Sequence, residues 1–345
     1  MATSKKWVKG GEYETKDHHQ ELTNKIIALM EESKKLNWEK PWFTCKELPY
    51  NPMTGTQYKG VNVISLMASG FDDPRFLTFK GVQEMSAKTG VEMRVKKGAK
   101  GTPVFKAVNV VFKEGGQDSG ETEPAQPGAA RSFWKMVYAG TVFNASQIEG
   151  MEPYKVRENI VVDHEEVKAL TQALIARTGL QVVHSEMGRA YYSPAEHKVH
   201  MPNEEMFKSP QAYYDTLLHE YGHSTGPALK RDMSGGKGSD SYAKEELVAE
   251  LCSTFMGAEL GLPHDPKTHE NHVAYLESWL SALKNDKNFI FAAASKASKA
   301  TEYQMTHLKE HKLDLERTQQ QEWILNNVIE PVHAPARTKT LTMSI

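Results

Sequence analysis

The chain has 345 residues, of which 39% are hydrophobic and 25% are charged, and these proportions are typical of a folded globular protein. No run approaches the roughly 18 apolar residues of a membrane span, and no apolar segment follows the basic first residues. The sequence therefore argues against a membrane or secreted protein, and we expect a cytoplasmic one. Two cysteines, Cys45 and Cys252, are too few for a disulfide framework.

Length and charge distribution both indicate two domains. A chain of this size exceeds one ordinary hydrophobic core. Residues 1–113 contain 19 Lys and Arg against 12 Asp and Glu, although the whole chain has a net charge of −2. We predict one domain at 1–150, a second at 160–330 and a flexible tail at 331–345.

The N-terminal half mixes helical and strand patterns. Residues 15–37 form an amphipathic helical pattern, and 76–90 read as a short strand followed by a helix. Residues 91–108 read as two strands around a basic, glycine-containing turn. The polar segment 114–130 fits either a domain linker or a disordered tip of a hairpin, and its strand-like flanks favour the hairpin.

The second half is mainly helical, with two strand-like segments at 180–186 and 189–202. One helix has Ser209 as its N-cap and Pro210 at its first position. The predicted helices lie at 164–179, 210–226, 241–260, 267–304 and 305–329. Together the two halves predict an α+β fold, with a small sheet in the second domain.

A possible metal site lies in the helix that follows Pro210. His219, Glu220 and His223 form an H-E-x-x-H sequence, which on a helix places both imidazoles on one face. A chain of this composition would contain such a motif by chance in roughly one case in twenty. The motif by itself is therefore only suggestive, and it needs support from a third ligand.

The following helix offers that ligand in Glu246, with Glu250 one turn further on. A zinc site of this type needs a third protein ligand and an open position for water, and a second carboxylate can orient a ligating histidine. The alternative is that Glu245, Glu246 and Glu250 form a solvated charged face. We predict His219, His223 and Glu246 as ligands of one divalent ion, and we expect zinc. We expect the Glu250 carboxylate to orient one of the two histidines.

The expected chemistry of this site is metal-assisted hydrolysis, with Glu220 as the general base. Tyr191, Tyr192 and Tyr242 are weaker candidates for donors to an oxyanion, because tyrosine is common in strands and helix caps. The residues do not identify a substrate. Whether the site is catalytic stays open.

The N-terminal half combines aromatic and basic residues. Single-stranded nucleic acid is bound by such combinations, because bases stack on aromatic faces and cations contact phosphates. The alternative is that the aromatic residues belong to the core and that the lysines are ordinary surface charge. On composition alone the alternative is favoured.

In the order of its motifs, the chain resembles the ArdC-type antirestriction proteins over nearly its whole length. The segments that carry the resemblance include NWEKPW, NPMTGTQYKGVNVISL, PRFLTFKGVQ, VKKGAKGTPV, RAYYSPAEHKVHMP, YYDTLLHEYGHSTG and YAKEELVAEL. The resemblance implies an N-terminal single-stranded-DNA-binding domain, a zincin-like metallopeptidase domain and protection of incoming plasmid or phage DNA from host restriction. Ser224 stands where the family usually has a Trp after the second histidine.

The resemblance places the metal ligands on His219, His223 and Glu246, and it favours the DNA-binding interpretation of the N-terminal half. The residues expected to contact DNA are Trp38, Trp42, Tyr58, Lys59, Asn62, Arg75, Phe79, Lys80, Lys96, Lys97 and Lys100. Two functions compete. One is a DNA-binding antirestriction protein with an auxiliary metal domain, and the other is a regulatory metalloprotease that cleaves a host protein and uses DNA binding for localisation. Besides single-stranded DNA, the expected partner is a host restriction enzyme or another protein substrate.

Overall fold

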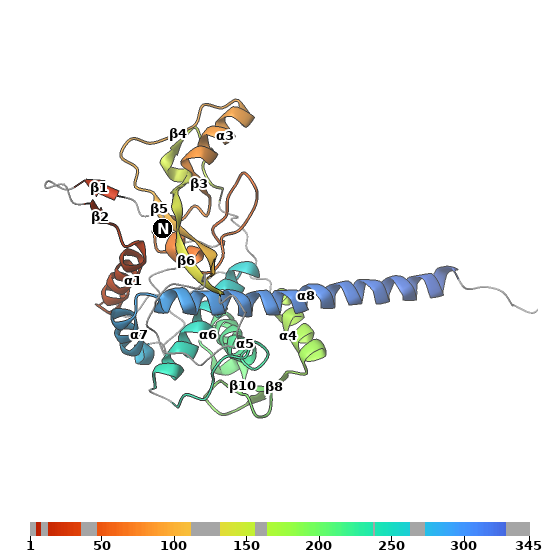
Figure 1. Ribbon diagram of the computed structural model, residues 1–345. Helices are drawn as coiled ribbons and strands as arrows, with labels where there is room; N and C mark the ends of the chain where they lie inside the picture. The colour runs from red at the N-terminus through yellow and green to blue at the C-terminus, as the bar shows by residue number, and fades with distance from the viewer. Residues whose placement is uncertain are drawn as a thin grey trace, which may run out of the picture.

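The computed structural model describes residues 5–7, 13–35, 47–111, 132–155, 164–236, 239–262 and 273–328. These residues form a mixed helix and sheet structure, as predicted (Figure 1). The expected tail at 331–345, the tip at 114–130 and residues 156–159 between the two predicted domains lie outside the described residues. The division into two domains therefore stays a prediction.

The N-terminal half contains one long helix and several short elements. Its helices are α1 (His18–Lys35), α2 (Val61–Met67) and α3 (Phe79–Thr89), and its strands are β1 (Lys5–Trp7), β2 (Tyr13–Thr15), β3 (Phe76–Thr78), β4 (Arg94–Val95), β5 (Thr102–Val111), β6 (Ser132–Asn144) and β7 (Ile148–Glu149). The predicted helix at 15–37 and the predicted strand and helix at 76–90 are confirmed. Gly90 ends α3 in the left-handed conformation, φ 72°.

A long antiparallel hairpin, β5 and β6, dominates this half. Phe105 pairs with Tyr138 and Val111 with Ser132, and β3 joins the free edge of β6 to give the order β3-β6-β5. The pairing confirms a hairpin around the polar segment and excludes a linker between domains there.

The C-terminal half packs helices around a three-stranded sheet. Its helices are α4 (Glu165–Thr178), α5 (Pro210–Ser224), α6 (Asp240–Glu259), α7 (Val273–Asn285) and α8 (Phe289–Val328), and its strands are β8 (Gln181–Ser185), β9 (Tyr191–Ser193) and β10 (Lys198–Pro202). The central strand β10 runs parallel to β8 and antiparallel to β9. This sheet is the small sheet that the sequence predicts.

The predicted break between the last two helices, at residues 304 and 305, is wrong. Helix α7 ends at Asn285, a turn follows at 286–288, and α8 then continues without interruption through residue 304. Asp286 explains the end of α7, because its carboxylate accepts a hydrogen bond from the Asn288 N–H at 2.8 Å and so stabilises a turn. No proline or glycine occurs near residue 304 to end a helix there.

Helix α8 lies between the two halves (Figure 1) and contributes to both. Its buried residues Ala294 and Ala297 belong to one continuous hydrophobic core with residues of α1, α2, α5 and α6. Ser298 accepts a hydrogen bond from the Gly60 N–H at 2.8 Å. The far end of α8 extends away from the rest of the molecule. Within the described ranges, no helix combines the length and apolar character needed to cross a bilayer.

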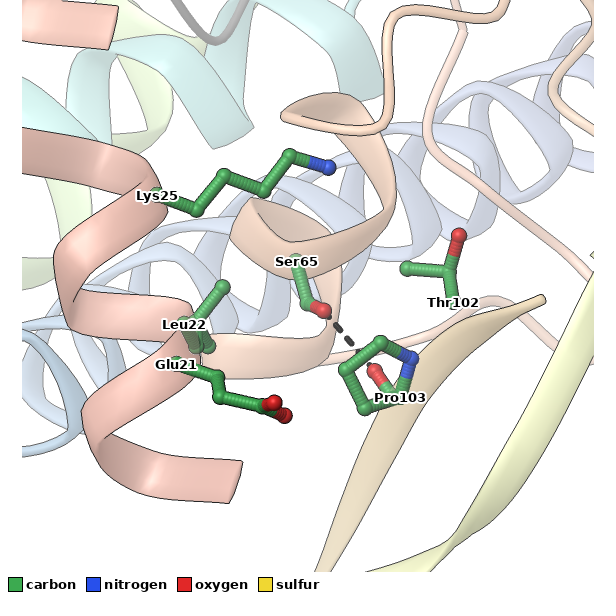
Figure 2. Close-up of a pocket in the computed structure, with 6 residues that line it drawn as sticks. All are labelled: Glu21, Leu22, Lys25, Ser65, Thr102 and Pro103. Carbon is green, nitrogen blue, oxygen red and sulfur yellow. Dashed lines mark hydrogen bonds between the residues drawn. The ribbon is translucent and has the colours of Figure 1, made fainter. Parts of the chain in front are cut away.

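A small cavity of about 170 Å³ lies in the N-terminal half, between α1, α2 and the start of β5 (Figure 2). Ser65 closes one wall by donating a hydrogen bond to the Pro103 carbonyl at 2.8 Å. Burial lowers the pKa of Lys25, which points into this space. The lining residues include none from α5 or α6, so the cavity is separate from the predicted metal site.

Candidate metal centre

Helix α5 holds the H-E-x-x-H residues where the sequence predicts them. The Ser209 side chain accepts a hydrogen bond from the Ala212 N–H at 3.2 Å, and Pro210 occupies the first helical position. This cap fixes the start of the helix. His219 and His223, one turn apart, therefore face the same neighbour, α6.

Helix α6 begins at Asp240, one residue before the predicted start. Ser239 is its N-cap and accepts a hydrogen bond from the Tyr242 N–H at 3.2 Å. The helix crosses α5 at very short range, because a Cβ atom on Gly222 would lie 3.0 Å from the Ala249 Cα. A glycine inside the motif thus lets the carboxylates of α6 reach the histidines.

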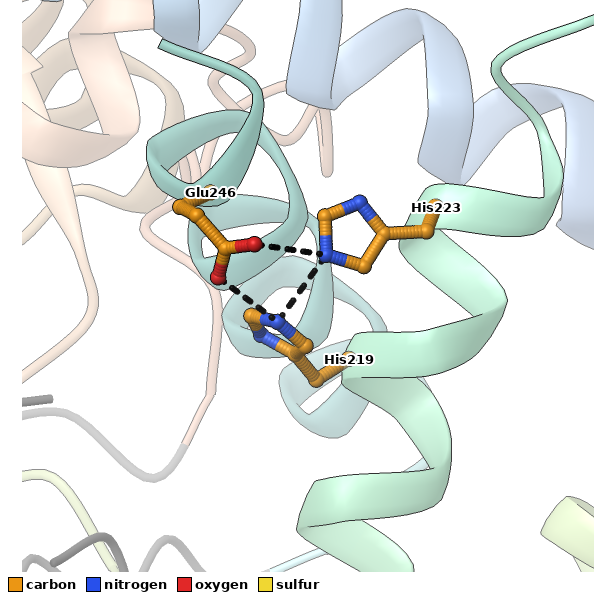
Figure 3. Close-up of side chains that lie close together, drawn as sticks. All are labelled: His219, His223 and Glu246. Carbon is orange, nitrogen blue, oxygen red and sulfur yellow. Dashed lines mark hydrogen bonds and ion pairs between the residues drawn. The ribbon is translucent and has the colours of Figure 1, made fainter. Parts of the chain in front are cut away.

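His219, His223 and Glu246 converge on one point (Figure 3). The two Nε2 atoms are 3.2 Å apart, and each lies 3.5 Å from one carboxylate oxygen of Glu246. One potential ligand atom from each of the three residues lies within 4.8 Å of the other two. Ligands 2.0–2.1 Å from a tetrahedral zinc ion are about 3.3 Å from one another, so the separations and the donor set fit a divalent cation.

The outer nitrogens of both histidines face carboxylates. His219 Nδ1 lies 3.5 Å from Glu250 Oε2, and His223 Nδ1 lies 3.2 Å from Glu245 Oε1. Glu245, Glu246 and Glu250 are all buried, so they do not form a solvated charged face. Glu250 has the position expected for it, whereas the contact of Glu245 was missed because Glu245 does not share a helical face with Glu250.

These carboxylates change the protonation of the histidines in the metal-free protein. Burial opposes a positive charge, but Glu246 and Glu250 outweigh it and raise the pKa of His219 to about 10. Glu245 and Glu246 similarly outweigh burial and raise the pKa of His223 to about 9. Burial alone would raise the pKa of Glu246, yet the two histidines lower it well below its usual range.

Glu220 lies beside this cluster and is buried, with 6% of its surface exposed. Burial raises the pKa of Glu220, and the neighbouring charges of His219 and His223 and, to a smaller extent, the backbone N–H of Tyr192 on β9 oppose the rise. Among the described residues, no group hydrogen-bonds to Glu220 Oε2. This oxygen can therefore accept a proton or a water hydrogen without losing another contact.

Two of the three tyrosines considered as oxyanion donors, Tyr191 and Tyr192, have other contacts. The Tyr192 hydroxyl is 2.8 Å from His197 Nδ1, and the Tyr191 ring stacks on His200. The backbone N–H of Tyr192 faces Glu220.

The residues predicted to contact DNA fall into two groups, apart from Trp38 and Trp42, which lie outside the described residues. The first group is exposed. Phe79 has 58% of its surface exposed at the start of α3, and exposed lysines occur beside it and in the turn between β4 and β5. They are Lys80, Lys96, Lys97 and Lys100.

The second group makes contacts inside the protein. Asn62 forms hydrogen bonds with both the N–H and the carbonyl of Phe105. Arg75 donates two hydrogen bonds to Asp73 and one to the Glu152 carbonyl. Tyr58 donates to the Phe76 carbonyl at 3.4 Å. For Asn62, Arg75 and Tyr58, the structure gives a local structural role, whereas Lys59 is exposed and lies 3.8 Å from the exposed Glu302.

An exposed aromatic residue that was not singled out in the sequence lies on the long hairpin. Trp134, on β6, has 71% of its surface exposed and is followed by the exposed Lys135. The three-dimensional hairpin shows that its side chain faces outward.

The fold and the convergent ligands define a zincin-like domain joined to an N-terminal α+β region, and comparisons with known proteins agree. Residues 169–296 match the zincin-like metallopeptidase family, and residues 16–143 match the N-terminal domain of the anti-restriction factor ArdC. The metal-free crystal structure of antirestriction protein ArdC from the R388 plasmid is 32% identical, with a TM-score of 0.65 over 86% of this chain and 99% of that chain. The Mn(II)-bound structure gives a TM-score of 0.62. The chain therefore belongs to the ArdC-type antirestriction protein family.

Two relatives match most of this chain over very different shares of their own length. A DNA primase TraC of Escherichia coli is 35% identical over 327 residues, which cover 92% of this chain but only 29% of the primase. The Sinorhizobium fredii protein y4eC is 32% identical, over 83% of this chain and 91% of its own length. This chain thus spans less than a third of the primase that it matches.

Proposed function

We propose that this protein binds single-stranded DNA in the cytoplasm and protects incoming DNA from host restriction, and that it carries one divalent metal ion, zinc in the first place. Family membership supports the antirestriction role. The observation that carries the metal proposal is the convergence of both Nε2 atoms and the Glu246 carboxylate. The manganese-bound ArdC structure supports a divalent ion in general.

The DNA proposal rests on the exposed group around α3 and the β4–β5 turn. Phe79 offers a face on which a base can stack, and Lys80, Lys96, Lys97 and Lys100 can contact phosphates. We expect salt-sensitive binding with a preference for single strands, measured by fluorescence anisotropy on oligonucleotides of one sequence in single- and double-stranded form. Equal affinity for the two forms would contradict the proposal.

A second candidate, a regulatory metalloprotease, is favoured by one observation. The buried Glu220, with its raised pKa and its Oε2 free of hydrogen bonds from the described residues, lies beside the three ligands. A bound divalent ion would supply a Lewis acid that makes water more acidic. Glu220 Oε2 would accept the proton, and the Tyr192 N–H would hold the carboxylate in place.

A restriction-protection assay with Glu220→Gln separates the two functions. If the metal domain is auxiliary, E220Q protects transferred DNA in cells as well as the wild type does. If proteolysis is the activity, E220Q loses protection while it keeps its metal and its DNA affinity. His200→Ala, on β10, is a matched control that we expect to behave as the wild type in every assay.

A further inference from the structure

A buried arginine lies behind the metal ligands. Arg231, whose side chain has 3% of its surface exposed, belongs to the segment that joins α5 to α6. Its guanidinium donates to both carboxylate oxygens of Glu245, from Nη2 to Oε1 at 2.7 Å and from Nε to Oε2 at 2.9 Å. This forked geometry holds a carboxylate in both position and orientation.

Glu245 connects that arginine to a ligand. The oxygen that receives Arg231 Nη2 also lies 3.2 Å from His223 Nδ1. A histidine that binds a metal through Nε2 carries its proton on Nδ1, and a carboxylate that accepts this proton fixes the tautomer and the ring orientation. Arg231, Glu245 and His223 thus form one continuous chain of contacts that leads to the predicted metal position.

The connecting segment holds Arg231 in place from its other side. Arg231 donates to the Gly222 carbonyl at 2.7 Å and to Thr225 Oγ1 at 2.5 Å, and its own N–H donates to the Gly226 carbonyl at 2.9 Å. Lys230, just before it, has a positive φ of 52°. A non-glycine residue keeps this conformation only where the surroundings enforce it. The turn at Lys230 therefore directs the Arg231 side chain back toward α5.

We propose that Arg231 is a positioning residue of the metal centre, which acts through Glu245 to orient His223 toward the ion. This inference rests on the proposed metal binding. It adds two residues, Arg231 and Glu245, that the sequence analysis did not assign to the site. Because Arg231 lies outside the H-E-x-x-H motif and outside α6, it gives the α5–α6 connection a role in metal affinity.

The test is a double-mutant cycle on metal affinity. The zinc dissociation constant is measured at one fixed pH by competition with a chromophoric chelator for the wild type, R231M, E245Q and the double variant. We expect R231M and E245Q each to weaken zinc binding by about 10- to 100-fold, the usual effect of removing a partner behind a ligand. The double variant should bind within about threefold of E245Q, because residues in one chain of contacts are not additive.

Two controls keep the inference open to refutation. S234A, in the same α5–α6 connection, removes a hydroxyl that hydrogen-bonds to Asp232 and should bind zinc within about threefold of the wild type. Cobalt spectra should show a changed visible absorption band for R231M and an unchanged band for S234A, which a general loss of stability does not produce. If R231M does not fold, the zinc affinity of E245Q takes its place in the test, because E245Q leaves the hydrogen bonds of Arg231 to Gly222 and Thr225 intact.

The outcomes separate this inference from the proposed function. If the wild type binds zinc and R231M, or E245Q in its place, binds equally well, the role of Arg231 is wrong while the metal centre stands. If the losses of R231M and E245Q multiply in the double variant, Arg231 does not act through Glu245. If the wild type itself binds no stoichiometric metal, both the metal centre and this inference are wrong.

Discussion

The metal centre and the proposed DNA surface differ in how closely the structure follows the sequence pattern. The ligands were predicted from a spacing, and His219, His223 and Glu246 converge to within 4.8 Å. The DNA contacts were predicted from composition and resemblance, and they divide into exposed residues such as Phe79 and internal ones such as Asn62 and Arg75. A spacing fixes directions on a helix, whereas composition does not distinguish a core residue from a binding residue.

The largest expected effect tests the metal side of this contrast. His223→Ala removes one of three ligands, so we expect zinc affinity to fall by more than the roughly 100-fold that loss of an outer partner can cause. Elemental analysis and chelator competition measure it. His200→Ala should keep the wild-type metal content. A full equivalent of metal, bound at wild-type affinity by H223A, would contradict the assignment.

Lowering the pH should weaken metal binding nearly as much as the loss of a ligand in H223A. Both histidines have raised pKa values in the metal-free protein, about 10 and about 9, so at pH 7 an ion must displace their protons. We expect affinity to fall by up to about 100-fold per pH unit below pH 9, with release of up to two protons. Calorimetry in buffers of different ionisation enthalpy counts these protons, and release of none would refute the proposal.

The same protonated rings stabilise the metal-free fold. Because their pKa values in the folded state lie above the unfolded value of about 6.5, this contribution is fully present below about pH 6.5 and is lost as the pH rises through about 9 and about 10. Thermal melts of the chelator-treated protein between pH 6 and 10 should therefore show a loss of stability that added metal removes.

The exposed lysines test the DNA side. Neutralising Lys96, Lys97 and Lys100 to Gln should weaken single-strand binding and reduce the slope of log K against log salt by about 2, since each phosphate contact contributes about 0.7. Fluorescence anisotropy over a salt series gives this slope. Lys168, Lys208 and Lys309, exposed in the other half, form the matched triple control. An unchanged slope would remove the β4–β5 turn from the DNA surface.

The smallest effects concern helix packing at the metal centre. Gly222→Ala places a Cβ 3.0 Å from the Ala249 backbone, so we expect a loss of about 1–3 kcal/mol in unfolding free energy and weaker metal binding as α6 moves away. Gly257→Ala, on α6 with nothing within 4 Å of the new Cβ, should gain about 0.5–1 kcal/mol. Urea unfolding compares the two. Equal effects would show that the close crossing of α5 and α6 is not required.

Local sequence determined the elements of the metal centre. The Ser209 and Pro210 signals fixed the start of α5, and the i, i+4 spacing fixed a common face for His219 and His223, because neighbours on a helix are set by its 3.6-residue period. The hairpin of β5 and β6 could likewise be predicted from its flanking strand patterns. The helix break at 286–288 could not, because it depends on one side-chain hydrogen bond.

Only the tertiary structure decided which groups meet. The role of Glu245 depends on Arg231 from a connection with no regular structure, and the approach of Glu246 depends on the contact between Gly222 and Ala249. The outward position of Trp134 and the internal contacts of Asn62 and Arg75 depend on the course of β6 and of its neighbours. Such contacts join residues far apart in the chain, and no periodicity in the sequence records them.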